Sequence, residues 1–213
     1  MRRIFGASAV LAIVAMGSVA GAASAADQTG SKGPEVQPMV SSSVVVNEVS
    51  TRGVNGPLDE FIELRNVSNR TVDLTGYTIR VYSSSNTVLD TIQLPAGMVL
   101  QPKGNAGQFV VLTGQNFSGT ISDQTNTLPF YLNGVEGIPS NGGVAIHNQV
   151  GSKLDGVAFS AGVTAAKEGQ PALPETAITE QLSASNARDI VSTDTDSNRV
   201  DFSLHVRTPG EIN

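Results

Sequence analysis

Short runs of β-branched and aliphatic residues, each closed by a turn signal, dominate the chain from residue 44 onward. Such runs predict strands, because β-branched side chains fit a pleated sheet while Gly, Asn and Pro favour turns. No segment after residue 25 carries the apolar stripe of an amphipathic helix. The pattern predicts an all-β antiparallel sandwich. We expect its strands at 44–49, 58–66, 78–82, 87–94, 108–113, 143–147, 154–159 and 202–206.

The first 25 residues have a different character. Arg2 and Arg3 precede an apolar stretch from Ile4 to Val19, and small residues at 23–25 follow it. This order is typical of a secretory signal peptide, cleaved near Ala25. The alternative is a membrane anchor, but the stretch is broken by Gly and Ser and is shorter than the about 20 residues that span a bilayer. The sequence therefore predicts a secreted, extracellular protein with no stable membrane insertion.

Residues 26–43 are rich in Gly, Ser, Gln and Pro, so we interpret them as a flexible leader. The folded domain is then expected to span residues 44–213. A domain of this length buries an adequate core without disulfides, and the chain has no cysteine. Residues 160–176, rich in Ala, Gly and Pro, are expected to form a long surface loop within the domain.

The balance of charged residues indicates which kinds of partner the chain can bind. The chain holds 13 Lys and Arg against 19 Asp and Glu, a formal net charge of −6. Removal of residues 1–25 takes away two arginines and no acid, so the mature chain carries 11 basic against 19 acidic residues, or −8. Proteins that bind nucleic acid need a basic face. We therefore do not favour nucleic acid as a partner.

Three stretches of the domain share features with a known family. They are 44–49 with its Asn-Glu pair, 59–66 followed by the Asp-Leu-Thr-Gly-Tyr corner of 72–79, and the Asp- and Asn-rich end at 187–213. Together they resemble the lamin tail domain (LTD) of bacterial proteins, in which many members carry Trp where Tyr77 stands here. The resemblance covers about residues 43–213, and residues 85–180 match in strand pattern alone.

The resemblance implies an immunoglobulin-like β-sandwich and says little about activity. Members of the family occur in nuclear lamins and as accessory modules beside secreted bacterial enzymes, and a fold does not by itself give a function. We expect a secreted, non-catalytic binding or structural module without a cofactor. Its partner would be an unidentified protein or cell-surface ligand. Exposed edge strands of a sandwich also leave pairing with another chain open.

One loop is a candidate metal site, and it suggests calcium-dependent adhesion as an alternative function. Its alternating oxygen-bearing side chains are Asp194, Asp196, Asn198 and Asp201. They stand at positions 1, 3, 5 and 8 of a short loop, and Ca²⁺ prefers about six to eight oxygen ligands. The match to an EF-hand is partial, because Arg199 and His205 replace its Gly and Glu. The other interpretation is an Asx-turn region that orients the last strand.

The residue patterns of known catalytic sites are less evident in this sequence than the metal-loop pattern. A hydrolase with an unrecognised site is therefore the least favoured class of function. The two histidines, His147 and His205, lie in no recognised motif, and we interpret both as structural or solvated. Phosphate-binding loops, the G-x-S-x-G elbow and H-E-x-x-H are missing from the sequence. Three acids lie at one strand start, where no cleft is expected: Asp59, Glu60 and Glu63. No catalytic residue is predicted.

The strand at 59–66 also predicts which side chains face the core. Ile62 and Leu64 share one face, while Phe61, Glu63 and Arg65 share the other. The aliphatic face suits the core. We expect the second face at the surface, with Glu63 and Arg65 forming a charge pair.

Overall fold

The computed structural model describes residues 43–134 and 136–213. The predicted signal peptide, 1–25, and the predicted leader, 26–43, lie outside these residues except for Ser43. The strands are β1 Val44–Ser50, β2 Phe61–Asn66, β3 Val72–Asp73, β4 Thr78–Tyr82, β5 Val88–Gln93, β6 Val99–Leu100, β7 Phe109–Thr113, β8 Thr127–Pro129, β9 Gly143–His147, β10 Lys153–Ala158, β11 Ala184–Ala187 and β12 Ser203–Val206. Two short helices complete the set, α1 Ala177–Gln181 and α2 Asn198–Asp201.

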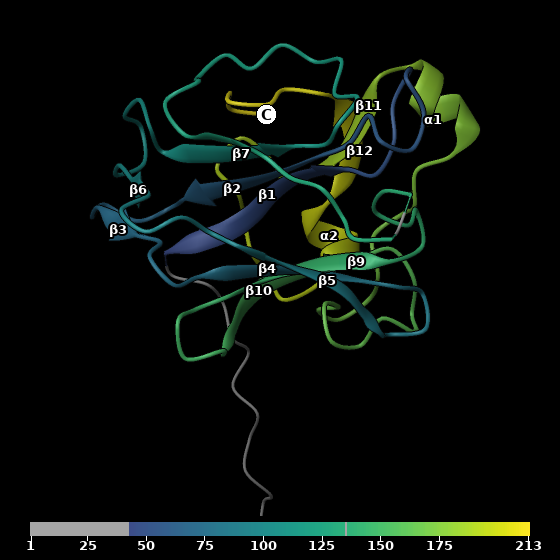
Figure 1. Cartoon of the computed structure of the whole chain (residues 1–213), viewed down its shortest axis with the longest axis horizontal. Helices are drawn as coiled ribbons and strands as arrows, with labels where there is room; N and C mark the ends of the chain where they lie inside the picture. Colours follow the sequence, from purple (N-terminus) through teal and green to yellow (C-terminus); the bar gives the residue numbers. More distant parts are fainter. Residues whose placement is uncertain (1–42, 135) are drawn as a thin grey trace, which may run out of the picture. The chain divides into compact units, whose positions relative to one another are not determined.

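Two sheets stacked face to face form the domain (Figure 1). The larger has the strand order β12-β11-β1-β2-β7-β8, and the smaller has the order β10-β9-β4-β5. Neighbouring strands run antiparallel, except that β7 and β8 run parallel. Strands β3 and β6 pair separately. The predicted all-β, immunoglobulin-like sandwich is confirmed.

Alternation along the strands builds the core between the sheets. Side chains at every second position of a strand point to one face, so each sheet offers one apolar face to the other. From β1 and β2 the core receives Val46, Val49, Ile62 and Leu64, and from β4 and β9 it receives Ile79, Val81, Val144 and Ile146. The prediction that Ile62 and Leu64 face the core is confirmed.

A bulge in β1 changes the alternation at one point. The pairing of β1 with β2 shifts between Val46 and Glu48, which adds one residue to β1. Asn47 and Glu48 consequently both turn away from the core. The Asn47 amide donates to Oε1 of Glu63 at 2.6 Å, and Glu48 accepts from the Ser185 hydroxyl at 2.5 Å.

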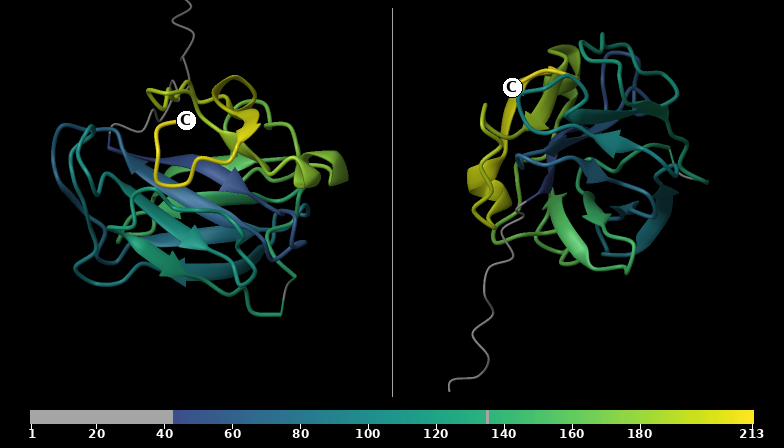
Figure 2. Two further views of the ribbon diagram at one scale, coloured as in Figure 1. Left: turned by 90° about the horizontal axis from the view of Figure 1, so that it is seen from above. Right: turned by 90° about the vertical axis from the view of Figure 1, so that its left-hand side faces the viewer.

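The outer face of β2 is buried, contrary to the expected surface position. Phe61 and Glu63 are fully buried and Arg65 nearly so. The charges of Glu63 and Arg65 interact as expected, but Arg65 donates its hydrogen bonds elsewhere, to Gln108 at 3.1 Å and to the Ser192 hydroxyl at 2.8 Å. The expectation was wrong because the C-terminal residues fold over this face of the larger sheet (Figures 1 and 2).

Arg207 fastens this C-terminal tail, residues 207–213, to the sheet. Its guanidinium donates to Oδ1 of Asp59 at 2.9 Å and to the Ser50 hydroxyl at 2.7 Å. Farther along, the amide of Thr208 donates to Glu48 at 3.0 Å and that of Gly210 to Glu63 at 2.6 Å. The tail thus supplies hydrogen-bond donors to carboxylates that β1 and β2 bury.

The segment 160–176 differs in part from the surface loop that we expected. It contains no helix or strand, but Val163 and Ala166 are fully buried and pack beside Tyr82 and Ala145. The loop therefore covers part of the smaller sheet. Small residues permit this close packing, since a side chain at Gly156 would collide with the carbonyl of Ala166.

Candidate functional site

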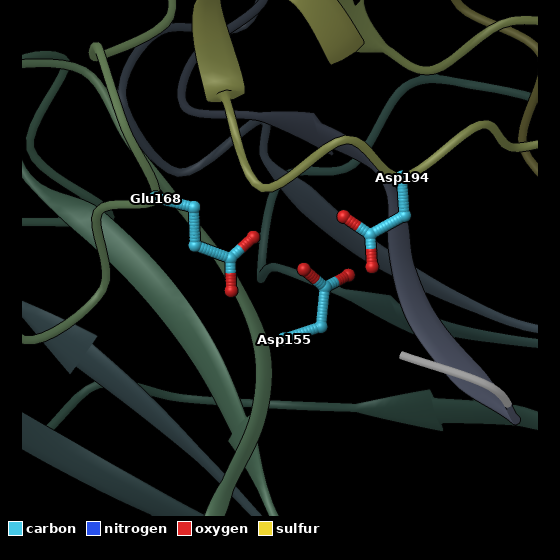
Figure 3. A group of neighbouring side chains, drawn as sticks. All are labelled: Asp155, Glu168 and Asp194. Carbon is cyan, nitrogen blue, oxygen red and sulfur yellow. The ribbon is translucent and has the colours of Figure 1, made fainter. Parts of the chain in front are cut away.

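Three carboxylates from distant parts of the sequence converge at one place in the domain. Asp155 lies on β10, Glu168 in the loop after it, and Asp194 in the loop between β11 and α2. Figure 3 shows their side chains pointing toward one another, and one oxygen of each lies within 4.8 Å of the others. A cluster of this kind needs positive charge, protons or hydrogen-bond donors to be stable in the interior.

Arg188, directly after β11, supplies most of that compensation. Its guanidinium is fully buried and donates from Nη2 to both oxygens of Asp155, at 2.9 and 3.0 Å. Nη1 lies 3.2 Å from Oδ2 of Asp201 and 3.7 Å from Oδ1 of Asp194. The planar, forked guanidinium suits several carboxylates at once, whereas an ammonium offers a single point charge.

The remaining donors of Arg188 bind backbone. Nε donates to the carbonyl of Val46 at 2.9 Å, and Nη1 donates to the carbonyl of Thr193 at 2.6 Å. The guanidinium carbon also lies 4.6 Å from the centre of the Phe202 ring, a cation–π contact. One side chain therefore joins β1, β10 and the loop that contains Asp194.

Asp155 is saturated with donors. Besides the two bonds from Arg188, its Oδ2 accepts from the amide of Val46 at 2.7 Å and its Oδ1 from the amide of Gly156 at 2.7 Å. Burial raises the pKa of Asp155, and the Arg188 charge opposes that rise. The carboxylate bridges the two sheets, because Val46 lies on β1 and Asp155 on β10.

Glu168 is the least compensated carboxyl of the cluster. Oε1 accepts from the Lys153 ammonium at 3.0 Å, while the buried Oε2 has no hydrogen-bond partner within 43–134 and 136–213. Burial, followed by the charge of Asp155, raises the pKa of Glu168 to about 9. The neutral form of Glu168 is therefore favoured, which reduces the negative charge of the cluster.

The structure brings Asp194, Asp196 and Asp201 of the predicted calcium loop near one another, whereas Asn198 makes other contacts. Asp194 joins the carboxylate cluster, and Asp201 contacts Arg188 and accepts from the Thr195 hydroxyl at 2.6 Å. Asn198 begins α2, and its Oδ1 accepts from the amides of Ala158 and Glu168 at 3.1 and 3.0 Å. Asp196 has a left-handed backbone with φ 56°. Calcium binding by the four residues together stays a prediction.

Three members of the site were not predicted as ligands: Asp155, Glu168 and Arg188. The sequence did contain a signal for Asp155, because this acid lies inside an apolar strand. An acid in a buried position normally has a partner of opposite charge, so a partner could have been expected. Arg188 stood within a stretch that carried the family resemblance but had no role assigned to it. Glu168 lies in a loop without a pattern, and only the fold brings it to Asp155.

The acids that we weighed for catalysis serve other contacts. Asp59 pairs with Arg207 and accepts from the Ser118 hydroxyl at 2.6 Å, and Glu63 lies under the tail. Glu60 accepts from the amide of Ile138 at 2.5 Å, and burial raises its pKa to about 7. Each carboxylate therefore fixes a loop or the tail to the larger sheet.

The two histidines lie at different places. His147 is buried on β9, where burial, followed by the charge of Arg80, lowers its pKa. His205 is exposed on β12, and its Nε2 lies 2.8 Å from the Ser203 hydroxyl. Both positions agree with the interpretation of each histidine as structural or solvated.

Comparison with protein families gave one match. A family model described as Lamin Tail Domain matches residues 37–161, more than half of the chain. The match covers β1 to β10 and ends before Glu168, Arg188 and Asp194. No curated protein matched the chain. Among the described residues, no helix has the length and apolar character needed to cross a membrane.

Replacement of Arg188 should strongly destabilise the domain. Arg188→Ala leaves Asp155 and Asp201 without their buried counter-charge, which costs about 3–5 kcal/mol for an ion pair of this kind. Arg188→Lys should recover only part of this, because one ammonium cannot replace Nε, Nη1 and Nη2, which bind Val46, Asp201 and Asp155 at the same time. Urea unfolding measures the free energy of unfolding of these variants, with Arg199→Ala, at an exposed arginine, as the control. Equal stability of Arg188→Ala and Arg199→Ala would contradict a structural role.

Glu60 should make stability depend on pH near neutrality. The unfolded carboxyl titrates near about 4.3 and the folded one near 7, so its contribution is complete below about pH 4 and is lost as pH rises through 7. The expected loss is on the order of 3 kcal/mol. Glu60→Gln keeps an acceptor for Ile138 but cannot ionise. Urea unfolding at pH 5 and pH 8 should show a smaller fall for this variant than for wild type; parallel falls would contradict the assignment.

Proposed function

The chain belongs to the lamin tail domain family, and from this premise we propose that it is a secreted, non-catalytic module that binds a protein or cell-surface ligand outside the cell. A lamin tail domain is an immunoglobulin-like module, a type of fold suited to structural and binding roles. The partner is expected to engage the surface of the sandwich, since the interior is filled by the core and its polar contacts.

The proposal that the module is non-catalytic rests on one observation: structural hydrogen-bond donors occupy the oxygens of the buried carboxylates Asp155 and Asp59. Asp155 accepts four hydrogen bonds, two from Arg188 and two from backbone amides. Asp59 accepts from Arg207, Ser118 and Asn55. A general base needs a lone pair directed at a substrate proton. Carboxylates that are saturated by structural donors support a scaffold instead.

Turnover tests this part of the proposal directly. Residues 26–213 should not hydrolyse a phosphodiester, an ester or a glycoside above the uncatalysed rate. Activity that persists through purification and disappears in His147→Ala would replace the proposal with a hydrolase.

Secretion is supported by the order of residues 1–25, in which basic, apolar and small residues follow one another. When the full chain is expressed in a bacterial host, we expect the protein outside the cytoplasm with Ala26 at its N-terminus. Mass spectrometry of the exported protein measures this. Ala25→Tyr should block cleavage, because a signal peptidase requires a small residue before the cut. Intact chain retained in the cytoplasm would contradict the proposal.

A second candidate function is calcium-dependent adhesion, favoured by one observation. Asp155, Glu168 and Asp194 bring three carboxylate oxygens within 4.8 Å, and Oε2 of Glu168 is buried without a hydrogen-bond partner within the described residues. A hard cation binds oxygens in such a setting. Asp194 and Glu168 would bind the cation, which would replace the proton of Glu168. Asp155 would remain paired with Arg188.

Thermal unfolding of residues 26–213 in calcium and in EDTA tests this candidate. Calcium at 100 times its Kd should add about 2.7 kcal/mol, which raises Tm by several degrees. Asp194→Asn should abolish the rise, whereas Asp73→Asn, an exposed acid on β3, should keep it. A Tm that does not change with calcium would remove this candidate and leave the Asp194–Asp201 loop as an Asx-turn region.

A further inference from the structure

The larger sheet ends at β12, which has a neighbour on one side only. Strand β12 pairs with β11, and its other margin is not paired by any strand of residues 43–134 and 136–213. All four residues, Ser203–Val206, are exposed. Figure 2 shows this C-terminal strand, in yellow, at the margin of the domain. An edge of this kind can accept a strand from another chain.

The phase of the ladder shows which backbone groups are available. The amide of Arg207 donates to the carbonyl of Ser183 at 3.1 Å, so residues 183 and 207 face each other as a hydrogen-bonded pair. Antiparallel pairs alternate, which makes 185–205 and 187–203 hydrogen-bonded pairs as well. The N–H and C=O groups of Leu204 and Val206 consequently point away from β11, toward the open margin.

The other margins of the two large sheets, formed by β8, β5 and β10, each have a feature that opposes strand addition. Strand β8 ends in Pro129, which has no N–H to offer. Strand β5 carries Asp90, whose carboxylate accepts from the amide of Asn133 at 2.8 Å. Strand β10 lies against β1, where Asp155 accepts from Val46. β12 contains no proline, acid, Lys or Arg, so it lacks the usual devices that prevent strand addition.

The two sides of β12 differ in chemistry. Leu204 and Val206 point to the same side and are 36% and 71% exposed. Ser203 and His205 point to the other side and line a hollow of about 410 Å³ with Asp189, Ile190, Thr193, Val200, Asp201 and Asn213. A strand added here would therefore place alternate side chains on an aliphatic side and on a polar, acidic side.

Charge distinguishes between the classes of strand that could bind. The segment 177–213 contains Glu180, Asp189, Asp194, Asp196, Asp201 and Glu211, against three arginines. Arg188 and Arg207 are bound to carboxylates, and among the acids Asp194 and Asp201 contact Arg188 while Glu180 pairs with Arg52. The charges that remain are three acids, Asp189, Asp196 and Glu211, against the exposed Arg199. An acidic surrounding attracts a basic strand. It repels a second copy of residues 26–213, whose formal charge is −8, from 11 basic and 19 acidic residues.

We propose that β12 binds a basic, extended peptide segment of a partner protein by strand addition. The peptide continues the larger sheet through the backbone of Leu204 and Val206. Aliphatic residues of the peptide lie beside Leu204 and Val206, and Lys or Arg residues lie on the side of His205 and Asp189. This inference rests on the proposed binding function and specifies its surface and its class of partner.

A designed peptide tests the proposal without knowledge of the partner. The probe is a short fluorescent peptide of alternating lysine and valine, added to residues 26–213, with binding followed by fluorescence anisotropy. We expect saturable binding that weakens with added salt. A peptide of alternating glutamate and valine should bind about tenfold more weakly or less. The lysine–valine peptide with every second backbone nitrogen methylated should not bind, because it cannot form the ladder.

Variants of β12 locate the site. Leu204→Pro removes an outward N–H while the ladder to β11 uses residues 203 and 205, so the sheet should persist. Its affinity for the peptide should fall about tenfold, the loss of one backbone bond. Leu204→Val keeps the N–H and should bind as wild type does. If Leu204→Pro does not fold, hydrogen exchange of the wild-type protein tests the site instead. Bound peptide should protect the amides of Leu204 and Val206 from exchange.

The outcomes separate this inference from the proposed function. Peptide binding that protects residues 88–93 of β5 overturns the β12 site and leaves the binding module intact. Equal binding by Leu204→Pro and Leu204→Val, or no binding of the lysine–valine peptide, also overturns it. Dimerisation through β12 in the analytical ultracentrifuge, without peptide, would assign the edge to a second copy. Secretion and turnover are measured independently, so the proposed function fails on different results.

Discussion

The ion pair between Arg188 and Asp155 is the contact on which the closure of the sandwich depends. Both side chains are fully buried, and together they contact β1, β10 and the loop after β11. The family match ends at residue 161, yet Arg188 and the strands β11 and β12 come later in the chain. Because β11 pairs directly with β1, these later residues are part of the same sheet. The domain therefore extends structurally to the C-terminal tail, beyond the portion that the family match covers.

Buried carboxyls outnumber buried guanidiniums in this domain, and the difference is made up in three ways. Arg188 and Arg207 each neutralise an acid directly. For others the neutral form is favoured, since burial raises the pKa of Glu63 well above its usual value and the nearby Glu48 raises it further. Backbone amides also contribute, as those of Thr208 and Gly210 in the tail do for Glu48 and Glu63. Glu48 and Glu63 face each other across β1 and β2, so the tail that covers them is needed by the sheet beneath it.

The sequence predicted those parts of the fold that depend on local pattern. The bounds of β4 and β9 agree with the expected 78–82 and 143–147, because both strands are β-branched and end at turns. Strand β11, Ala-Ser-Asn-Ala, has no β-branched residue, and only its pairing with β1 and β12 makes it a strand. The expected surface face of β2 was wrong because alternation does not show what covers a face. Within the site, Asp194 was identified, whereas Glu168 required knowledge of which loops meet.

The same polar interior bears on where a partner can bind. Polar groups that are saturated inside a domain hold its elements rigidly, because each bond must be broken before an element moves. The edges β5, β8 and β10 are held by a loop contact, a proline and a neighbouring strand respectively. β12 is anchored from behind by β11 and followed by Arg207, which fixes the tail to Asp59. A strand that is fixed in position and still has unpaired backbone groups loses little entropy when it accepts a peptide, which favours binding at that edge.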